Sequence, residues 1–359
     1  MQAVYARLID ALKPRGGDVP MVKCEEAEQL FSELFTVEEA ELAGEMPLAP
    51  FTAVELSARF PHKDPAKVAE AVEGMCDHGL CVAFDLPGGR HYTMPPLLPG
   101  FMEYFFMRGE DNERTRRIAA LLDKYLEVSM KTREKEGDTS WSFAPFRVIS
   151  VEKEIDSGYQ VQPYDVLDRY IDTADCIALC TCFCHHFEEM KGNHCCDKPM
   201  EVCFNFGRVG RNNINRGFAR EITRDEAHRI LKQSEEAGLV HCASNTGKYI
   251  DALCNCSGCH CHGLKYINQR VAAKMISISS FIARINAEEC IACGDCVPRC
   301  QAFAITMEAD TAVLNLDRCI GCGLCKSTCP SGAITLELRE PAPVPPLNRR
   351  ELDARLVGK

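Results

Sequence analysis

The chain has 359 residues, enough for two or three domains, and a formal net charge of −11. This balance disfavours nucleic acid and anionic membrane surfaces as partners, and no run of eighteen apolar residues predicts a transmembrane helix. The 23 cysteines, in a chain whose first residues show no secretory signal, predict a cytoplasmic protein that binds metal and does not form disulfides.

Residues 1–100 are predicted to form a small helical domain that ends in a β-hairpin. A capping box of Thr52 and Glu55 starts one short helix, and Asp64-Pro65 starts the next. The apolar runs that follow flank Pro87-Gly88-Gly89-Arg90, a hairpin turn signal. Helices followed by a hairpin resemble a winged helix-turn-helix, which implies either DNA binding or protein docking.

Charge distinguishes these two roles. Residues 1–100 contain 8 Lys and Arg against 16 Asp and Glu, a balance of −8. The predicted recognition helix carries one lysine, Lys67, against Glu70, Glu73 and Asp77. A DNA reader needs cations to neutralise phosphates. We therefore expect a docking module, and nucleic acid is disfavoured as a partner. The alternative is a redox- or metal-responsive regulator that reads DNA.

Residues 101–162 are predicted as connecting helices followed by an extended linker. An aromatic patch spans Phe101 to Phe106, and an apolar stripe at helical spacing runs from Ile118 to Met130. Both features indicate packing within or between domains.

Residues 163–283 are predicted as a cysteine-rich iron–sulfur domain. Twelve cysteines lie between residues 176 and 261, and all but Cys242 fall in two groups separated by a helix that Thr223 and Glu226 cap. This helix is a spacer that can fold the second group back onto the first. We expect one or two clusters that draw thiolates from both groups. The best candidates for metal ligands are Cys180, Cys182, Cys196, Cys203, Cys254, Cys256, Cys259 and Cys261, and the second choices are Cys176, Cys184, Cys195 and Cys242.

Zinc is the alternative in this domain, because it accepts mixed cysteine and histidine ligands. The histidines available for such a site are His185, His194, His260 and His262. Arg208, Arg211, Arg216 and Arg220 make the most basic stretch of the chain, which suggests either a solvated loop or a contact for an acidic partner or anionic substrate.

Residues 284–340 carry two runs of the form C-x2-C-x2-C-x3-C, the second followed by Pro330. This spacing resembles that of bacterial two-cluster ferredoxins. The resemblance implies two [4Fe-4S] clusters with exchanged fourth ligands. One cluster would be held by Cys290, Cys293, Cys296 and Cys329, and the other by Cys319, Cys322, Cys325 and Cys300. Zinc is disfavoured here, because it usually takes pairs of cysteines separated by a dozen or more residues.

The two runs belong to an internal repeat of 29 residues. Asn286 falls on Asn315, and Ala304-Ile305-Thr306 falls on Ala333-Ile334-Thr335. Pseudo-two-fold packing explains this match. Gln301 stands where such ferredoxins usually have proline, which should alter the packing and hydration around Cys300.

The whole arrangement resembles iron–sulfur proteins of anaerobic bacteria and archaea that join a winged-helix-like start, a cysteine-rich middle and a ferredoxin end. Motifs that carry the resemblance include Cys180-Thr181-Cys182, Cys196-Asp197-Lys198-Pro199 and Cys254-Asn255-Cys256. It implies an α+β multidomain fold, iron–sulfur binding and little more about function. Residues 341–359 form a proline-rich tail, either disordered or ending in a short docking helix.

No G-x-G-x-x-G follows a predicted strand, and no P-loop or nucleophile–base pair is recognisable. We therefore expect an electron-transfer protein or subunit that serves a partner oxidoreductase, with its clusters as one-electron centres. The alternatives are the DNA-binding regulator and a reductase whose middle cluster is incompletely ligated.

Overall fold

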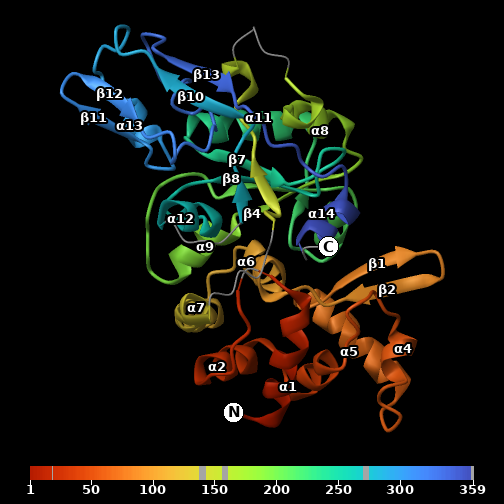
Figure 1. The fold of residues 1–359 in the computed structure, drawn as a ribbon. Helices are drawn as coiled ribbons and strands as arrows, with labels where there is room; N and C mark the ends of the chain where they lie inside the picture. The colour runs from red at the N-terminus through yellow and green to blue at the C-terminus, as the bar shows by residue number, and fades with distance from the viewer. Residues whose placement is uncertain (18, 137–142, 156–160, 270–274, 357–359) are drawn as a thin grey trace. The chain divides into compact units, whose positions relative to one another are not determined.

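The computed structural model describes residues 1–359 except 18, 137–142, 156–160, 270–274 and 357–359. The described chain divides into two compact units, each assembled from segments distant in sequence (Figure 1). The first unit comprises Met1–Trp141, Phe183–His194 and Asn212–Ala219. The second comprises Ser142–Cys182, Cys195–Arg211 and Arg220–Lys359. Nineteen of the 23 cysteines belong to this second unit.

The first unit begins with five short helices. They are α1 (Ala3–Leu12), α2 (Glu25–Leu34), α3 (Val37–Gly44), α4 (Ala53–Ser57) and α5 (Pro65–Asp77). The Thr52 hydroxyl accepts a hydrogen bond from the Glu55 amide at 3.2 Å, and the Glu55 carboxylate accepts one from the Thr52 amide at 2.7 Å. The predicted capping box is thus present. The Asp64 carboxylate caps α5 by accepting from the Ala66 amide at 2.9 Å, with Pro65 as the first helical residue.

A hairpin follows α5, as the turn signal predicts. It consists of β1 (Val82–Leu86) and β2 (Gly89–Thr93), which are antiparallel with Leu86 opposite Gly89. Gly88 and Gly89 have φ angles of 106° and 115°, a region that favours glycine. Short helices followed by a hairpin match the predicted element order, and the assignment of a winged-helix-like fold stays a prediction.

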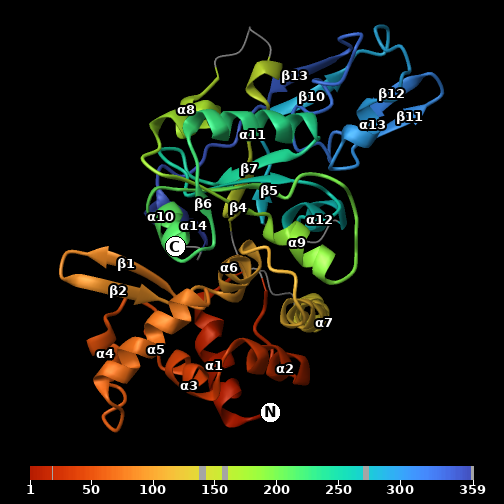
Figure 2. The same cartoon turned by 180° about the vertical axis from the view of Figure 1, so that it is seen from behind.

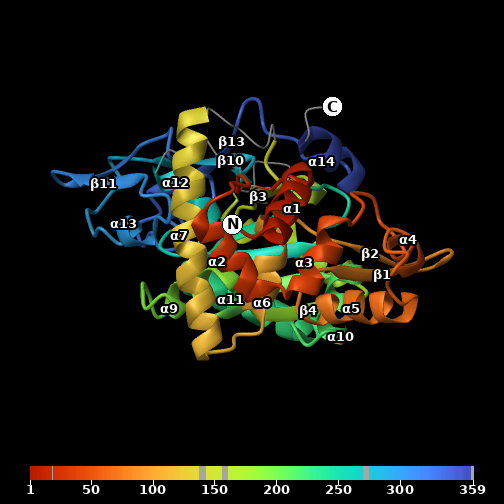
Figure 3. The same ribbon diagram turned by 90° about the horizontal axis from the view of Figure 1, so that it is seen from below.

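The remaining helices of this unit are α6 (Met102–Met107), α7 (Glu113–Glu136) and α9 (Phe183–Met190). The long helix α7 packs against α2, and α9 packs against α6 and α7 (Figure 3). The core is aromatic. Phe31 lies beside Phe101 and Tyr125, with ring centroids 6.5 and 6.1 Å apart. All three rings are fully buried, and Phe101 and Tyr125 come from the predicted aromatic patch and apolar stripe.

The second unit is organised around a seven-stranded sheet with the order β6-β4-β5-β8-β7-β3-β9 (Figure 2). Neighbouring strands are antiparallel except β3 and β9, which are parallel. The strands are β3 (Phe146–Val148), β4 (Ile177–Thr181), β5 (Glu201–Phe206), β6 (Arg220–Glu221), β7 (Val240–Ser244), β8 (Ala252–Cys256) and β9 (Ile276–Ser277). Strand β3 precedes residue 163, so the sheet includes part of the predicted linker.

Helices connect and flank these strands. They are α8 (Leu167–Thr173), α10 (Gly207–Asn215), α11 (Arg224–Glu236), α12 (His262–Gln269) and α14 (Arg349–Leu356). Thr223 caps α11, because its hydroxyl accepts from the Glu226 amide at 3.1 Å. The tail is held by its backbone: the Gly247 amide donates to the Pro346 carbonyl at 2.8 Å. Leu352 of α14 is buried.

The C-terminal part of this unit is built from two small sheets. Strand β10 (Phe281–Ile285) pairs with β13 (Ile334–Leu338), and β11 (Ile305–Glu308) pairs with β12 (Thr311–Leu314). A short helix, α13, spans Cys296–Arg299. The strands of the two repeats correspond at an offset of 29 residues, and each sheet takes one strand from each repeat.

Hydrogen bonds follow the same symmetry. The Asn286 amide donates to the Ala333 carbonyl, and the Asn315 amide donates to the Ala304 carbonyl, both at 2.8 Å. The predicted pseudo-two-fold packing is therefore present in the structure.

Candidate metal centres

The first repeat of the C-terminal domain and the end of the second form one thiol-lined hollow. The cysteines that line it are Cys290, Cys293, Cys296 and Cys329, the combination that the ferredoxin resemblance implies. Cys296 is buried, whereas Cys293 is exposed. A hollow with four thiols on its wall, three from one loop and one from the other, fits an iron–sulfur cluster.

The other four cysteines form a second, deeper group: Cys300, Cys319, Cys322 and Cys325. Cys300 and Cys319 are electrostatic neighbours of both Cys322 and Cys325. Burial raises the pKa of the Cys322 thiol to about 12 and also raises the pKa of Cys325. Thiols in such surroundings ionise when a metal binds them, so this group also fits a cluster.

The backbone of these loops is shaped for thiolate ligands. The Ala304 amide donates to the Cys300 sulfur at 3.2 Å, and the Ala312 amide lies 3.5 Å from the Cys290 sulfur. Amide donors of this kind tune cluster potentials. Gly321, which directly precedes Cys322, has a φ of 73°, and a Cβ there would overlap the Phe281 carbonyl oxygen.

A row of four cysteines crosses the large sheet. Cys180 of β4 lies opposite Cys203 of β5, and Cys242 of β7 lies opposite Cys254 of β8. Strands β5 and β8 pair Phe204 with Leu253, which makes Cys203 and Cys254 the next opposed positions. Directly opposed residues point to the same face of a sheet with their Cβ atoms about 4.5–5.5 Å apart. The strand order thus gathers thiols that are up to 74 residues apart in the sequence.

Three further cysteines extend this row into a cluster of seven thiols, which we call the sheet thiols. They are Cys180, Cys182, Cys203, Cys242, Cys254, Cys256 and Cys261. Cys203 is hydrogen-bonded to Cys182 and Cys254, and Cys256 is hydrogen-bonded to Cys242, Cys254 and Cys261. Hydrogen bonds from Cys203 and Cys256 lower the pKa of Cys254 to about 6, while its partners keep their protons. Cys254 therefore links Cys203 to Cys256 within the group.

The sheet thiols adjoin the deeper group of the C-terminal domain. Cys242 is an electrostatic neighbour of Cys322, and both lie in one buried cluster together with Cys256, Cys261 and Cys300. Gln301 strengthens this contact. Its side-chain oxygen accepts from the Ser257 hydroxyl at 3.0 Å and from the Gly258 amide at 2.9 Å.

A separate group lies beside the sheet, on two loops. Cys195 and Cys196 precede β5, and Cys259 and His260 lie between β8 and α12. The Cys195 and Cys259 sulfurs are 3.1 Å apart, and His260 Nδ1 lies 3.8, 3.7 and 3.6 Å from the sulfurs of Cys195, Cys196 and Cys259. We call these four residues the loop group.

The side chains of the loop group shift one another's pKa values. Burial raises the pKa of Cys259, but hydrogen bonds from Ser257, His260 and the neighbouring thiols outweigh it and lower this pKa to about 6. Burial lowers the pKa of His260, but its contacts with Cys182 and Cys259 outweigh it and raise this pKa to about 10. Of the eight predicted ligands in the middle domain, Cys196 and Cys259 thus belong to the loop group and the other six to the sheet thiols.

Sequence reasoning ranked Cys195 and Cys242 too low to include among the best candidates, although both lie in these groups. Cys242 has no cysteine within ten residues, so only the β7–β8 register reveals its place. Cys176 is buried near Asp175 and Arg211, outside both groups. Cys184, His185 and His194 lie on or next to α9 in the first unit, where Cys184 packs against the hydrophobic core.

Arginines of the basic stretch, Arg208 to Arg220, form ion pairs with acidic side chains of their own unit. Arg216 pairs with Glu73 at 2.6 Å and also with Asp77. Arg211 pairs with Asp175 at 2.5 Å. These ion pairs leave less free charge for an acidic partner than the sequence indicates.

Residues 283–336 match the model of the family described as the 4Fe-4S dicluster domain. This match and the paired thiol groups identify the C-terminal part as a ferredoxin-type domain that binds iron–sulfur clusters. No curated protein and no solved structure matches the chain. Among the described residues, no helix combines the length and the apolar character needed to cross a membrane.

Proposed function

We propose that this chain is an electron-transfer protein or subunit. The ferredoxin-type domain holds two [4Fe-4S] clusters, on Cys290, Cys293, Cys296 and Cys329 and on Cys319, Cys322, Cys325 and Cys300. The sheet thiols hold at least one further cluster. Electrons pass through these centres to or from a partner oxidoreductase, in the reducing cytoplasm where thiols stay available to metal.

The observation that carries the proposal is the continuity of the thiol groups. Cys296 of the first group is an electrostatic neighbour of Cys325 of the second, and Cys322 of the second is a neighbour of Cys242 in the sheet. Three potential one-electron centres therefore adjoin one another. Bound clusters of this type accept and release single electrons.

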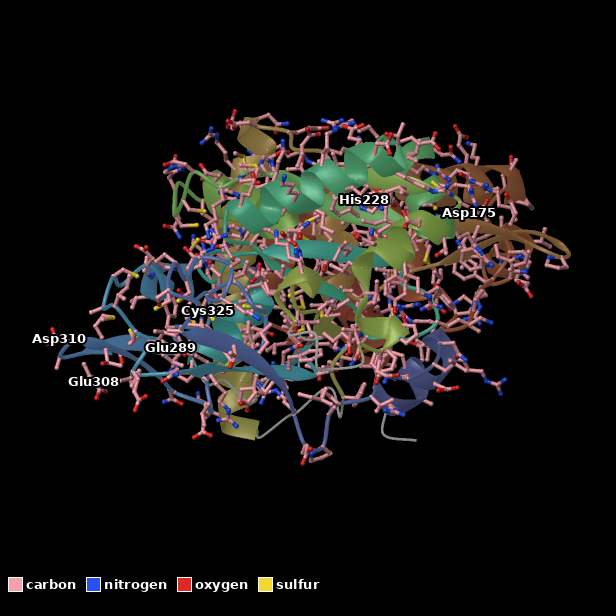
Figure 4. All side chains as sticks on the ribbon, turned by 90° about the horizontal axis from the view of Figure 1, so that it is seen from above. Asp175, His228, Glu289, Glu308, Asp310 and Cys325 are labelled. Atoms are coloured by element: carbon pink, nitrogen blue, oxygen red, sulfur yellow. The ribbon has the colours of Figure 1, made fainter. Side chains whose placement is uncertain are left out.

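The exposure of the thiols favours the first group, which contains Cys293, as the place where a redox partner docks. Cys293 is exposed, whereas Cys322 is partly buried and Cys325 is buried. The exposed Ile291 lies beside Cys293 in the chain. Glu289, Glu308 and Asp310 are also exposed, and Figure 4 shows all three toward one end of the ferredoxin-type domain. This acidic end supports docking of a partner with a basic surface.

The experiment is metal and sulfide analysis of the full chain purified without oxygen. Two clusters in the ferredoxin-type domain give about eight irons, and one cluster on the sheet thiols raises this to about twelve. Cys254→Ser should lose about four irons and the corresponding sulfide. Cys176→Ser, a buried thiol outside the groups, is the matched control and should lose none.

Reduced samples should also give the paramagnetic signals of iron–sulfur clusters, and the signal that disappears in Cys254→Ser identifies the sheet cluster. Colourless protein without such signals would refute the whole proposal. Equal iron in the wild type, Cys254→Ser and Cys176→Ser would refute only the cluster on the sheet.

A further inference from the structure

We propose that the loop group, Cys195, Cys196, Cys259 and His260, binds a single zinc ion in a site distinct from the iron–sulfur centres. This inference does not depend on electron transfer, because it concerns four residues outside the ferredoxin-type domain and outside the sheet thiols. Its ligands are three sulfurs and one ring nitrogen, a combination that structural zinc sites use.

Distances between the ligand atoms favour one ion over a cluster. A tetrahedral zinc ion with Zn–S bonds of about 2.3 Å and Zn–N bonds of about 2.0–2.1 Å places its sulfurs about 3.8 Å apart and each sulfur about 3.5 Å from the nitrogen. The three distances from His260 Nδ1 to the sulfurs lie between 3.6 and 3.8 Å. Cys195, Cys196 and His260 offer ligand atoms that are all within 4.8 Å of one another.

A [4Fe-4S] cluster requires a different arrangement. Each of its thiolates binds a separate iron, so the sulfurs stand apart by the width of the cube. The Cys195 and Cys259 sulfurs are in contact, 3.1 Å apart. Atoms at this separation can share one ion between them, and the fourth donor of the loop group is a ring nitrogen, which zinc accepts.

Neighbouring residues bury the site and offset its charge. The His260 side chain is 1% exposed, and the Ser257 hydroxyl lies 3.2 Å from the Cys259 sulfur. Three thiolates, a neutral histidine and Zn²⁺ sum to a charge of −1. The half-buried Lys198 is an electrostatic neighbour of Cys195, Cys196 and Cys259, so its ammonium group offsets this charge.

The position of the site indicates what the ion does. Cys195 and Cys259 are 64 residues apart and lie on loops at opposite ends of the segment that contains β5, α11, β7 and β8. An ion bound by both loops closes this segment and holds Cys256 and Cys261, which flank one of the loops, in place. The zinc therefore stabilises the scaffold of the sheet thiols and has no open position for substrate.

Cys182 is the sheet thiol nearest to this site, since it is hydrogen-bonded to the His260 ring. It is also hydrogen-bonded to Cys203, and it lies two residues beyond Cys180 at the end of the row. We assign it to the sheet thiols for that reason.

The test is the metal content of the full chain expressed in medium with both iron and zinc and purified without oxygen. We expect about one zinc per chain in the wild type. Cys196→Ser and His260→Asn should lose most of this zinc and keep their iron and sulfide. The matched controls, Cys176→Ser and His228→Asn, change a buried thiol and an exposed histidine outside the group and should keep both metals.

Zinc X-ray absorption on the wild type avoids any dependence on folding of the variants. We expect three sulfurs at about 2.3 Å and one nitrogen at about 2.0–2.1 Å. Zinc surrounded only by oxygen and nitrogen would overturn the proposal. So would a loss of about four irons, instead of one zinc, in both Cys196→Ser and His260→Asn, because that result assigns the loop group to a cluster. The latter outcome would leave the proposed electron transfer intact.

Discussion

Gln301 occupies the position where two-cluster ferredoxins usually have proline, and the structure gives it a specific role. Its side chain accepts hydrogen bonds from Ser257 and Gly258, and its carbonyl accepts one from the Asn268 amide group at 3.0 Å. Proline has no side-chain oxygen with which to accept the first two bonds. The substitution therefore fastens the ferredoxin-type domain to the loop that carries Cys259.

Replacing Gln301 with alanine should destabilise this contact. The Ser257 hydroxyl and the Gly258 amide would lose their partner in a buried region, at a cost of about 1–3 kcal/mol for each unsatisfied donor. We expect a lower thermal unfolding temperature and a changed signal of the cluster on Cys300. Gln233→Ala, an exposed glutamine on α11, is the control. An unchanged unfolding temperature in Gln301→Ala would show that the bonds are dispensable.

Glu73 sets a pH dependence in the first unit. Burial raises its pKa, but hydrogen bonds from Arg90, Tyr92 and Arg216 outweigh this and hold the pKa at about 2, below the ordinary 4.5. Because the folded pKa is lowered, the stabilisation is complete above the unfolded value of 4.5 and is lost as the pH falls through about 2. The partly exposed position limits it to about 1–2 kcal/mol.

The prediction is that Glu73→Gln lowers the hydrogen-exchange protection of α5 and β2 at pH 7, and that its difference from the wild type shrinks below about pH 4.5. Glu70→Gln, an exposed carboxylate on the same helix, should leave protection unchanged at every pH. A difference between wild type and Glu73→Gln that grew as the pH fell would contradict the assignment.

At the scale of elements, each small sheet pairs a strand of one repeat with a strand of the other. This arrangement favours cluster sites that take their fourth ligand from the other repeat. Strand β10 pairs with β13, so the end of the second repeat lies against the start of the first. Cys329 lines the hollow of Cys290, Cys293 and Cys296 for this reason. The ligand exchange that we propose between the repeats is the arrangement that this strand topology favours.

Alkylation of the native protein tests this pairing. Cys329→Ser should expose Cys290, Cys293 and Cys296 to a thiol reagent while the second cluster protects its own ligands. Cys300→Ser is the matched variant and should give the reverse pattern, with Cys319, Cys322 and Cys325 modified. Peptide mass spectrometry reads out both. Labelling of the same peptides in the two variants would rule out the exchange.

Local signals in the sequence predicted local structure well. The caps at Thr52, Asp64 and Thr223 are present, because a cap needs only residues a few positions apart. The spacing and the 29-residue repeat indicated the ferredoxin-type domain for a similar reason. The row of cysteines on the sheet was different. It depends on strand order and register, which join residues distant in the chain, and neither property is encoded in a short motif.

At the scale of the whole molecule, charge limits the choice of partner. The net charge is −11, and the exposed face of α5 carries Lys67 beside Glu70. Sequence composition predicted this balance, although it did not reveal that Arg216 is paired with Glu73. The acidic surface favours a basic protein as the partner over nucleic acid.

We therefore predict that the full chain does not retard duplex DNA in a gel-shift measurement at low salt, where phosphate contacts are strongest. Both oxidised and reduced protein should be examined, because a regulator would respond to the state of its clusters. A specific shift that Lys67→Glu abolishes, and that Lys232→Glu on the second unit leaves intact, would favour the regulator instead.

The exchange of strands between the two repeats also has a consequence during synthesis. Phe281 pairs with Leu338, so β10 has no partner until the ribosome has made 57 more residues. The first cysteine loop leaves the ribosome long before the strand that closes it. The site of Cys290, Cys293 and Cys296 therefore stays open in the nascent chain until Cys329 and β13 have been made.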